Sequence, residues 1–221
     1  MERMNGQDTL LQPGDTGLKV ISIREELLQI NGLEAVYHGC DQTWYKTVWQ
    51  RMSGCGPTTA SSLFLYHRRS KKHMPQPEKA ECLRLMEEFW GYITPTARGV
   101  HTTKEFCEGA ERFAKAHSLR VDTATLDVPK EPDIRPTRDT VLRFLEEALQ
   151  NDLPVAFLNH NNGAEKRLDS HHWVAIVALS YVPDGETEIT FVDESIIKRI
   201  DIASWLRTTT GGGGFATLRF F

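Results

Sequence analysis

The order of two hydrophobic patterns constrains the fold of this chain more than any other sequence feature. Between residues 58 and 150, apolar side chains recur at helical spacing, interrupted by one candidate strand at 119–128. The rest of the chain changes to short segments rich in β-branched and aromatic residues. These segments predict strands over 154–158, 172–181, 187–192, 196–200 and 215–221. Helices followed by a run of strands predict an α+β fold, with an N-terminal helical part and a C-terminal antiparallel sheet.

The length and composition are those of one folded domain. The chain has 221 residues, of which 40% are hydrophobic, so it can bury a sizeable core without disulfides or a metal ion. The first 17 residues are polar and contain Gly and Pro. We therefore expect a partly ordered N-terminal extension over residues 1–35 and a single domain over residues 36–221.

The charge and hydropathy patterns argue against several partners. The chain has 26 Lys and Arg against 30 Asp and Glu, a net charge of −4, which gives no basic surface for nucleic acid. We find no run of about 18 apolar residues and therefore expect no membrane span. The polar start lacks the apolar stretch of a secretory signal, so we expect a cytoplasmic protein, although delivery outside the cell by another route stays open. The sequence leaves the oligomeric state unknown.

Cys55 has the sequence setting of a reactive thiol. It lies in Ser53-Gly-Cys-Gly-Pro-Thr, directly before a helix predicted over 58–69. The positive end of a helix dipole lowers the pKa of a thiol and favours the nucleophilic thiolate. We expect the flanking Gly54 and Gly56 to leave room for a substrate carbonyl and to expose backbone N–H groups to an oxyanion. The alternative is a buried thiol that packs as a small hydrophobic residue.

The other three cysteines lack this setting. Cys82 and Cys107 fall in helical segments and are expected in the core, whereas Cys40 stays open. Four cysteines at these spacings do not predict a disulfide scaffold. His38, Cys40 and Asp41 lie close together, but no second ligand pair has the spacing of a zinc site, so we expect no metal and no other cofactor.

A base and an orienting carboxylate for Cys55 come from the predicted strands. His172 opens the strand 172–181, and strand alternation places it on one face with Val174, Ile176 and Ala178. If this strand and 187–192 form a hairpin, Asp193 comes close to His172 and can hold the imidazole in its productive tautomer. Taken singly, each could be an ordinary loop or turn residue.

A further hydrogen-bond donor is needed for the oxyanion of a tetrahedral intermediate. Gln50, five residues before Cys55, is our candidate, and Gln42 is its competitor. A solvated loop position is the alternative for both side chains.

In order and setting, these residues resemble the papain-like cysteine peptidases, and among them the bacterial branch that includes double-glycine leader peptidases of bacteriocin exporters. The resemblance rests on Gln50, Gly54-Cys-Gly-Pro, His172-Trp-Val-Ala-Ile-Val and Val192-Asp, and it covers about residues 36–221. It implies a papain-like fold in which Cys55 is the nucleophile, His172 the general base, Asp193 the orienting residue and Gln50 the oxyanion donor. The 117 residues between Cys55 and His172 favour the compact bacterial branch.

The resemblance predicts a cysteine-dependent hydrolase, a peptidase or amidase that acts on a peptide or another amide through a thioester acyl-enzyme. Two alternatives remain. An acyltransferase or transpeptidase would use the same residues with a different acceptor. A module on the same fold could also bind peptides or a partner protein without turnover, although such a module has no need for all three catalytic residues.

Overall fold

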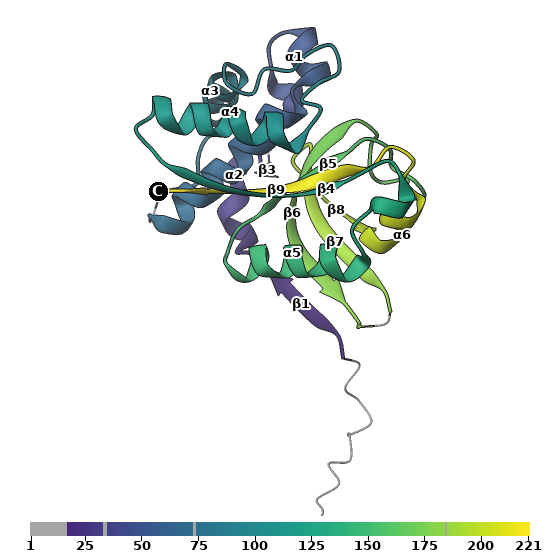
Figure 1. The fold of residues 1–221 in the computed structure, drawn as a ribbon. Helices are drawn as coiled ribbons and strands as arrows, with labels where there is room; N and C mark the ends of the chain where they lie inside the picture. Colours follow the sequence, from purple (N-terminus) through teal and green to yellow (C-terminus); the bar gives the residue numbers. More distant parts are fainter. Residues whose placement is uncertain (1–16, 33–34, 73, 184) are drawn as a thin grey trace, which may run out of the picture.

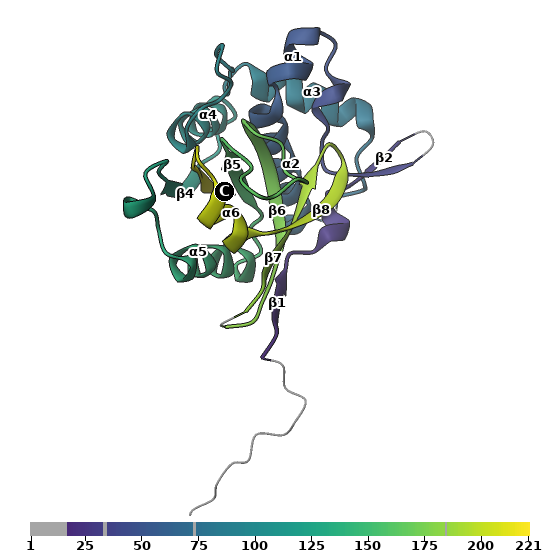
Figure 2. The same ribbon diagram turned by 90° about the vertical axis from the view of Figure 1, so that its right-hand side faces the viewer.

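The computed structural model describes residues 17–32, 35–72, 74–183 and 185–221, and it confirms the mixed α+β class (Figures 1 and 2). In this part of the chain the helices are α1 (Val48–Ser53), α2 (Cys55–Lys71), α3 (Lys79–Trp90), α4 (Thr103–Ala116), α5 (Arg138–Gln150) and α6 (Ile202–Thr208), with short 3₁₀ helices η1 (Glu25–Leu28), η2 (Gln42–Trp44) and η3 (Pro132–Ile134). The strands are β1 (Lys19–Ser22), β2 (Gln29–Asn31), β3 (Val36–His38), β4 (Val121–Val128), β5 (Val155–Asn159), β6 (His172–Tyr181), β7 (Thr187–Asp193), β8 (Ile196–Asp201) and β9 (Gly213–Phe220).

The described strands form a seven-stranded sheet and a separate hairpin of β2 and β3. Six strands of the large sheet follow the order β4-β9-β5-β6-β7-β8, and every pairing is antiparallel. Strand β6 is the longest, and two strands share one of its edges. Its residues 172–176 pair with β5, and its residues 178–181 pair with β1. Strand β1 therefore pairs with the C-terminal part of β6, which β5 is too short to reach.

Alternation along β9 assigns the helices to the two faces of the sheet. The ring of Phe220 lies against Phe64 of α2 and Phe113 of α4. The ring of Phe215, an odd position on the same strand, faces Phe144 of α5 and Trp205 of α6 instead. Helices α2 and α4 thus cover one face, and α5 and α6 cover the other. Figure 1 shows α4 above and α5 below the strands β4 and β9.

Helix α2 runs through the centre of the molecule. All its residues from Cys55 to His67 are buried. Its first turns carry small and hydroxyl side chains, and the hydroxyls of Ser61 and Ser62 donate to the carbonyls of Pro57 and Thr58 one turn earlier. Hydroxyls satisfied within their own helix can be buried without an unpaired polar atom. This helix can therefore be surrounded by protein although its residues are not strongly apolar.

Two helix starts follow signals in the sequence. Thr102 and Glu105 form a capping box at α4, in which each side chain bonds to the backbone N–H of the other. The Thr137 hydroxyl caps α5 by accepting from the N–H of Thr140. Each cap stabilises its helix by about 1 kcal/mol. These caps fix the residues at which α4 and α5 begin.

The part of the expected 1–35 extension that the structure describes contacts the domain, because β1 pairs with β6 and the side chains of Ile23 and Leu28 belong to the main core. Residues 1–16 lie outside the described residues. Two other expectations are corrected by the structure. The helix expected to begin at residue 58 begins earlier. Helix α1 ends at Ser53 and α2 already begins at Cys55, so only Gly54 separates the two helices. Ala178 does not share a face with His172, because the pairing of β6 with β7 shifts between Ile176 and Ala178.

Candidate active site

Cys55 is the first residue of α2, and the two glycines beside it have a packing role. A Cβ on Gly54 would lie 2.5 Å from the ring of Tyr45, and a Cβ on Gly56 would lie 2.8 Å from the side chain of Val100. Both distances are too short for a side chain to fit. The expected open space beside the thiol is therefore filled by Tyr45 and Val100, and the glycines let these two residues approach the start of the helix.

The hairpin of β6 and β7 brings His172 and Asp193 together. Ala175 pairs with Val192, so Asp193 lies on the same face of the sheet as Val174 and His172. His172 Nε2 and Asp193 Oδ1 are 2.6 Å apart. A carboxylate accepts at this distance from the ring N–H, so Nδ1 is the ring nitrogen left for the thiol. The predicted partnership of these two residues has the geometry that orients an imidazole.

Cys55, His172 and Asp193 line one cavity of about 20 Å³. They come from α2, β6 and β7, and they are only 8%, 8% and 4% exposed. Trp173 forms part of the same wall, with its indole N–H donating to the carbonyl of Val100 and its ring stacked on Phe106. The site is thus narrow and lies between the start of the central helix and the adjacent ends of β6 and β7.

The electrostatics of the site favour a charged imidazole. Burial opposes the charge on His172, but interactions with Asp193 and with the Cys55 sulfur outweigh burial and raise the pKa of His172 to about 10. Burial also opposes ionisation of Asp193, but His172 and then Lys198 lower the pKa of this carboxyl. An imidazolium between a carboxylate and a sulfur atom is the partner that stabilises a thiolate.

Lys198 is a site residue that the sequence did not reveal. Its ammonium donates to Asp193 Oδ2 at 2.7 Å, so each oxygen of this carboxylate has a separate cationic partner. Lys198 lies on β8, five residues after Asp193 and across the turn that joins β7 to β8. The only available signal was a lysine on the strand next to the predicted carboxylate, and the register of β7 and β8 is needed to interpret it.

The turn after Asp193 is held in an unfavourable conformation. Asp193 pairs with Ile196, and the two residues between them, Glu194 and Ser195, have φ of 48° and 63°. Gly, Asn or Asp usually occupy these positions of a type I′ turn. The Ser195 hydroxyl donates to Asp41 Oδ2, and the Ser195 carbonyl accepts from the N–H of His38. These contacts fix the strained turn that presents Asp193.

The two glutamines lie in different places. Gln50 Oε1 accepts from the hydroxyl and the backbone N–H of Thr47 in the capping box of α1, and among the described residues Gln50 does not line the Cys55 cavity. Gln42 does line it. Its Oε1 is buried without a hydrogen-bond partner among the described residues. The structure therefore brings the competitor Gln42, and not Gln50, to the cysteine.

The other three thiols are buried. Cys82 and Cys107 are in the core as predicted, and burial raises the pKa of Cys107 to about 11. Cys40 lies in the wall of the Cys55 cavity. Burial, and then its contact with Cys82, raises the pKa of Cys40 well above the usual value, so Cys40 remains a protonated thiol. Cys55 is left as the cysteine with a base beside it.

Within the part of the chain that the structure describes, no three or more His, Cys, Asp or Glu side chains are placed to hold a metal ion. The described helices also include none that is long and apolar enough to span a membrane.

No known protein family has a model that matches this chain, and no curated protein matches it either. The function therefore has to be argued from the site itself.

Proposed function

We propose that this chain is a papain-like cysteine-dependent hydrolase that cleaves peptide or other amide bonds. One observation carries the proposal. Residues 55, 172 and 193, far apart in the sequence, converge on one cavity with a 2.6 Å contact between His172 and Asp193. A nucleophile, a base and a group that orients the base are the parts that covalent catalysis requires.

The reaction begins at the thiolate of Cys55. Its sulfur attacks the carbonyl carbon of the scissile amide, the C–S bond forms, and the carbonyl oxygen becomes an oxyanion. His172 then gives its proton to the leaving nitrogen, the C–N bond breaks, and a thioester remains on Cys55. In the second half, water loses a proton to His172 and attacks the thioester, the C–S bond breaks, and the acid leaves while the Cys55 thiolate and the protonated His172 are restored.

The remaining residues support these steps without reacting. Asp193 holds the imidazole so that one nitrogen faces the sulfur. Lys198 holds the second oxygen of Asp193 and keeps the carboxylate from rotating away from the ring. We assign Gln42 as the side-chain donor to the oxyanion in place of Gln50, because Gln42 lines the cavity and its buried Oε1 has no partner among the described residues. The opposite assignment of this amide places its NH₂ donor at that position.

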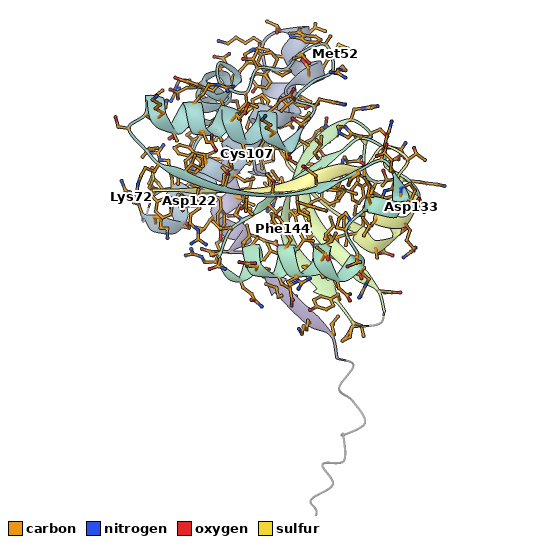
Figure 3. All side chains as sticks on the ribbon, viewed as in Figure 1. Met52, Lys72, Cys107, Asp122, Asp133 and Phe144 are labelled. Atoms are coloured by element: carbon orange, nitrogen blue, oxygen red, sulfur yellow. The ribbon has the colours of Figure 1, made fainter. Side chains whose placement is uncertain are left out.

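Exposed apolar side chains beside the site suit a peptide substrate. Val48, Trp49 and Met52 of α1 are 63%, 48% and 74% exposed, although they precede Cys55 by only three to seven residues. Met52 is labelled at the tip of this helix in Figure 3. An exposed apolar cluster next to a narrow site offers contacts for apolar side chains on one side of a scissile bond.

Acylation of Cys55 tests the proposal without knowledge of the natural substrate. We expect the chain to release one equivalent of p-nitrophenolate from p-nitrophenyl acetate in a rapid burst, while intact mass spectrometry shows one added acetyl group. The burst should vanish in Cys55→Ala and persist in Cys107→Ala, the matched control with a buried thiol replaced. A burst of the same size in Cys55→Ala would refute the assignment.

A further inference from the structure

A second cavity lies at the other end of α2, far from the proposed active site. It has a volume of about 530 Å³, within the range of about 300–1,000 Å³ that is typical of small-molecule sites. Its lining includes Phe64 and Arg68 of α2, whereas Cys55 is the first residue of that helix. Thirteen residues of helix separate Cys55 from Arg68, which is about 20 Å at 1.5 Å per residue. The two cavities are therefore independent.

The inner wall of this cavity is aromatic. The rings of Phe64, Phe113 and Phe220 line it and contact one another edge-on. Leu85 and Leu119 extend the apolar surface. Rings that are locked against each other form a rigid apolar wall, which can receive an apolar body without rearrangement.

The rim of the same cavity is basic. Arg68, Lys71 and Lys72 line it, and none of the three has an ion-pair partner among the described residues. Lys72 is labelled in Figure 3 on the side of the molecule where Figure 1 marks the C-terminus. The one acidic side chain among the described residues of the lining, Glu88, is already paired with His117 at 2.9 Å. The opening therefore presents cations whose charge is unmatched within the described chain.

We propose that this cavity binds a small anionic amphiphile, a carboxylate with an alkyl or aryl body. The body lies against the rings of Phe64, Phe113 and Phe220, and the carboxylate lies at the rim with Arg68 and Lys71. Charge complementarity selects an anionic head, because a cationic or neutral amphiphile of equal length would leave the rim unpaired. The proposal does not depend on the chemistry at Cys55.

Arg68 and Lys71 can also stabilise helix α2, and the experiment has to separate this effect from ligand binding. Arg68 and Lys71 lie in the last turn of α2, where cations interact favourably with the helix dipole. That role predicts a loss of thermal stability when they are replaced, and it predicts no effect on a ligand. The experiment therefore needs a control that removes cations with no cavity beside them.

Isothermal titration calorimetry of the whole chain with monomeric decanoate tests the proposal. We expect saturable 1:1 binding, roughly tenfold weaker binding of octanoate because two buried CH₂ groups are lost, and no binding of decyltrimethylammonium. Arg68→Gln combined with Lys71→Gln should weaken decanoate binding at least about tenfold. Lys104→Gln combined with Arg207→Gln, two exposed cations elsewhere, should leave it unchanged.

A filling variant gives an independent readout. Leu119→Trp places a large ring in the cavity and should abolish decanoate binding while circular dichroism shows an unchanged fold. If this variant fails to fold, the charge variants and the three amphiphiles still decide the question. Absence of decanoate binding would overturn the proposal, and so would equal binding of the decyl cation or an affinity that the Arg68 and Lys71 changes leave unaltered.

Discussion

The two ends of helix α2 are built in opposite ways. At its first residue, Cys55 lies in a cavity of about 20 Å³ that is also lined by the hydrogen-bonded pair His172 and Asp193. At its last turns, Arg68 and Lys71 border a cavity of about 530 Å³ with aromatic walls and cations that have no ion-pair partner among the described residues. The described lining of the larger cavity includes no Cys, Ser or Thr, whereas the smaller cavity has the candidate nucleophile but almost no free space.

On the proposed assignment, cavity size and chemical competence are separate properties of this chain. The widest apolar pocket is the usual first hypothesis for an active site. In this chain the stronger indicator is the convergence of Cys55 with the hydrogen-bonded pair His172 and Asp193 on one cavity, because it requires three segments to meet in a defined geometry. Substitutions around Cys55 should therefore lower the burst rate or the stability of the fold in proportion to their part in this geometry.

The largest effect is expected from the base at the reactive end. His172→Ala should lower the rate of the p-nitrophenyl acetate burst by at least about 10³-fold, since neither thiolate formation nor proton transfer remains assisted. His160→Ala, a histidine outside this cavity, is the control and should retain the burst. Stopped-flow absorbance measures both rates. Equal rates in the two variants would remove His172 from the mechanism.

A smaller loss is expected from the carboxylate that orients His172. Asp193→Asn should lower the burst rate by about 10²- to 10⁴-fold, because an amide neither fixes the tautomer nor stabilises the imidazolium. The measurement is the same burst assay, with Asp169→Asn as a control outside the site. A variant as fast as the unmodified chain would show that His172 needs no orienting partner.

A loss of about three- to tenfold in the burst rate is expected from Lys198→Met. Lys198→Met removes a charge that lowers the pKa of Asp193, so this carboxylate should protonate at a higher pH. The acid limb of the pH–rate profile should therefore move toward neutral pH, and Lys198→Arg should restore the original limb. A purely structural role would lower the rate without moving the limb.

Packing at the reactive end is tested by Gly56→Ala. The added Cβ would lie 2.8 Å from Val100, so we expect a loss of about 1–3 kcal/mol in the free energy of unfolding. Gly91→Ala is the matched control, because its φ is −65° and its nearest neighbour atom would be 3.3 Å away. Its unfolding free energy should change by less than about 0.5 kcal/mol. Urea denaturation measures both, and equal losses would contradict this account of Gly56.

The smallest effect is a pH dependence of stability. The pKa of His172 is raised to about 10 from an ordinary value of 6.5, so its stabilising contribution is fully present below about pH 6.5 and is lost as the pH rises through 10. Asp193→Asn removes the main source of this shift. The difference in melting temperature between the two proteins should therefore shrink from pH 6.5 to pH 10, and a constant difference would contradict the linkage.

Local signals in the sequence predicted much of the fold. Strand β6 begins and ends at the predicted residues, His172 and Tyr181, and α2 contains the helix predicted over 58–69. Both elements were accessible because hydrophobic periodicity depends on residues that are close in the sequence. The meeting of His172 and Asp193 was accessible too, since it follows once two adjacent strands form a hairpin.

The parts that could not be predicted depend on distant contacts. The packing role of Gly54 and Gly56 requires Tyr45 and Val100, and the bulge in β6 requires the register with β7. Gln50 bonds to the cap of α1, whereas Gln42 lines the Cys55 cavity. Their spacing from Cys55 along the chain does not predict this difference. The pairing of β1 with β6 could not be predicted either, because the free edge of β6 exists only once the sheet is formed.

The rate of Cys55 alkylation tests the central claim most directly. With iodoacetamide at neutral pH and mass spectrometry of each cysteine, we predict that Cys55 reacts at least about tenfold faster in the unmodified chain than in His172→Ala. Cys40, Cys82 and Cys107 should stay unlabelled in the folded protein. A Cys55 that reacts no faster than in His172→Ala, or no more than the buried cysteines, would contradict the claim that this thiol and imidazole form a catalytic pair.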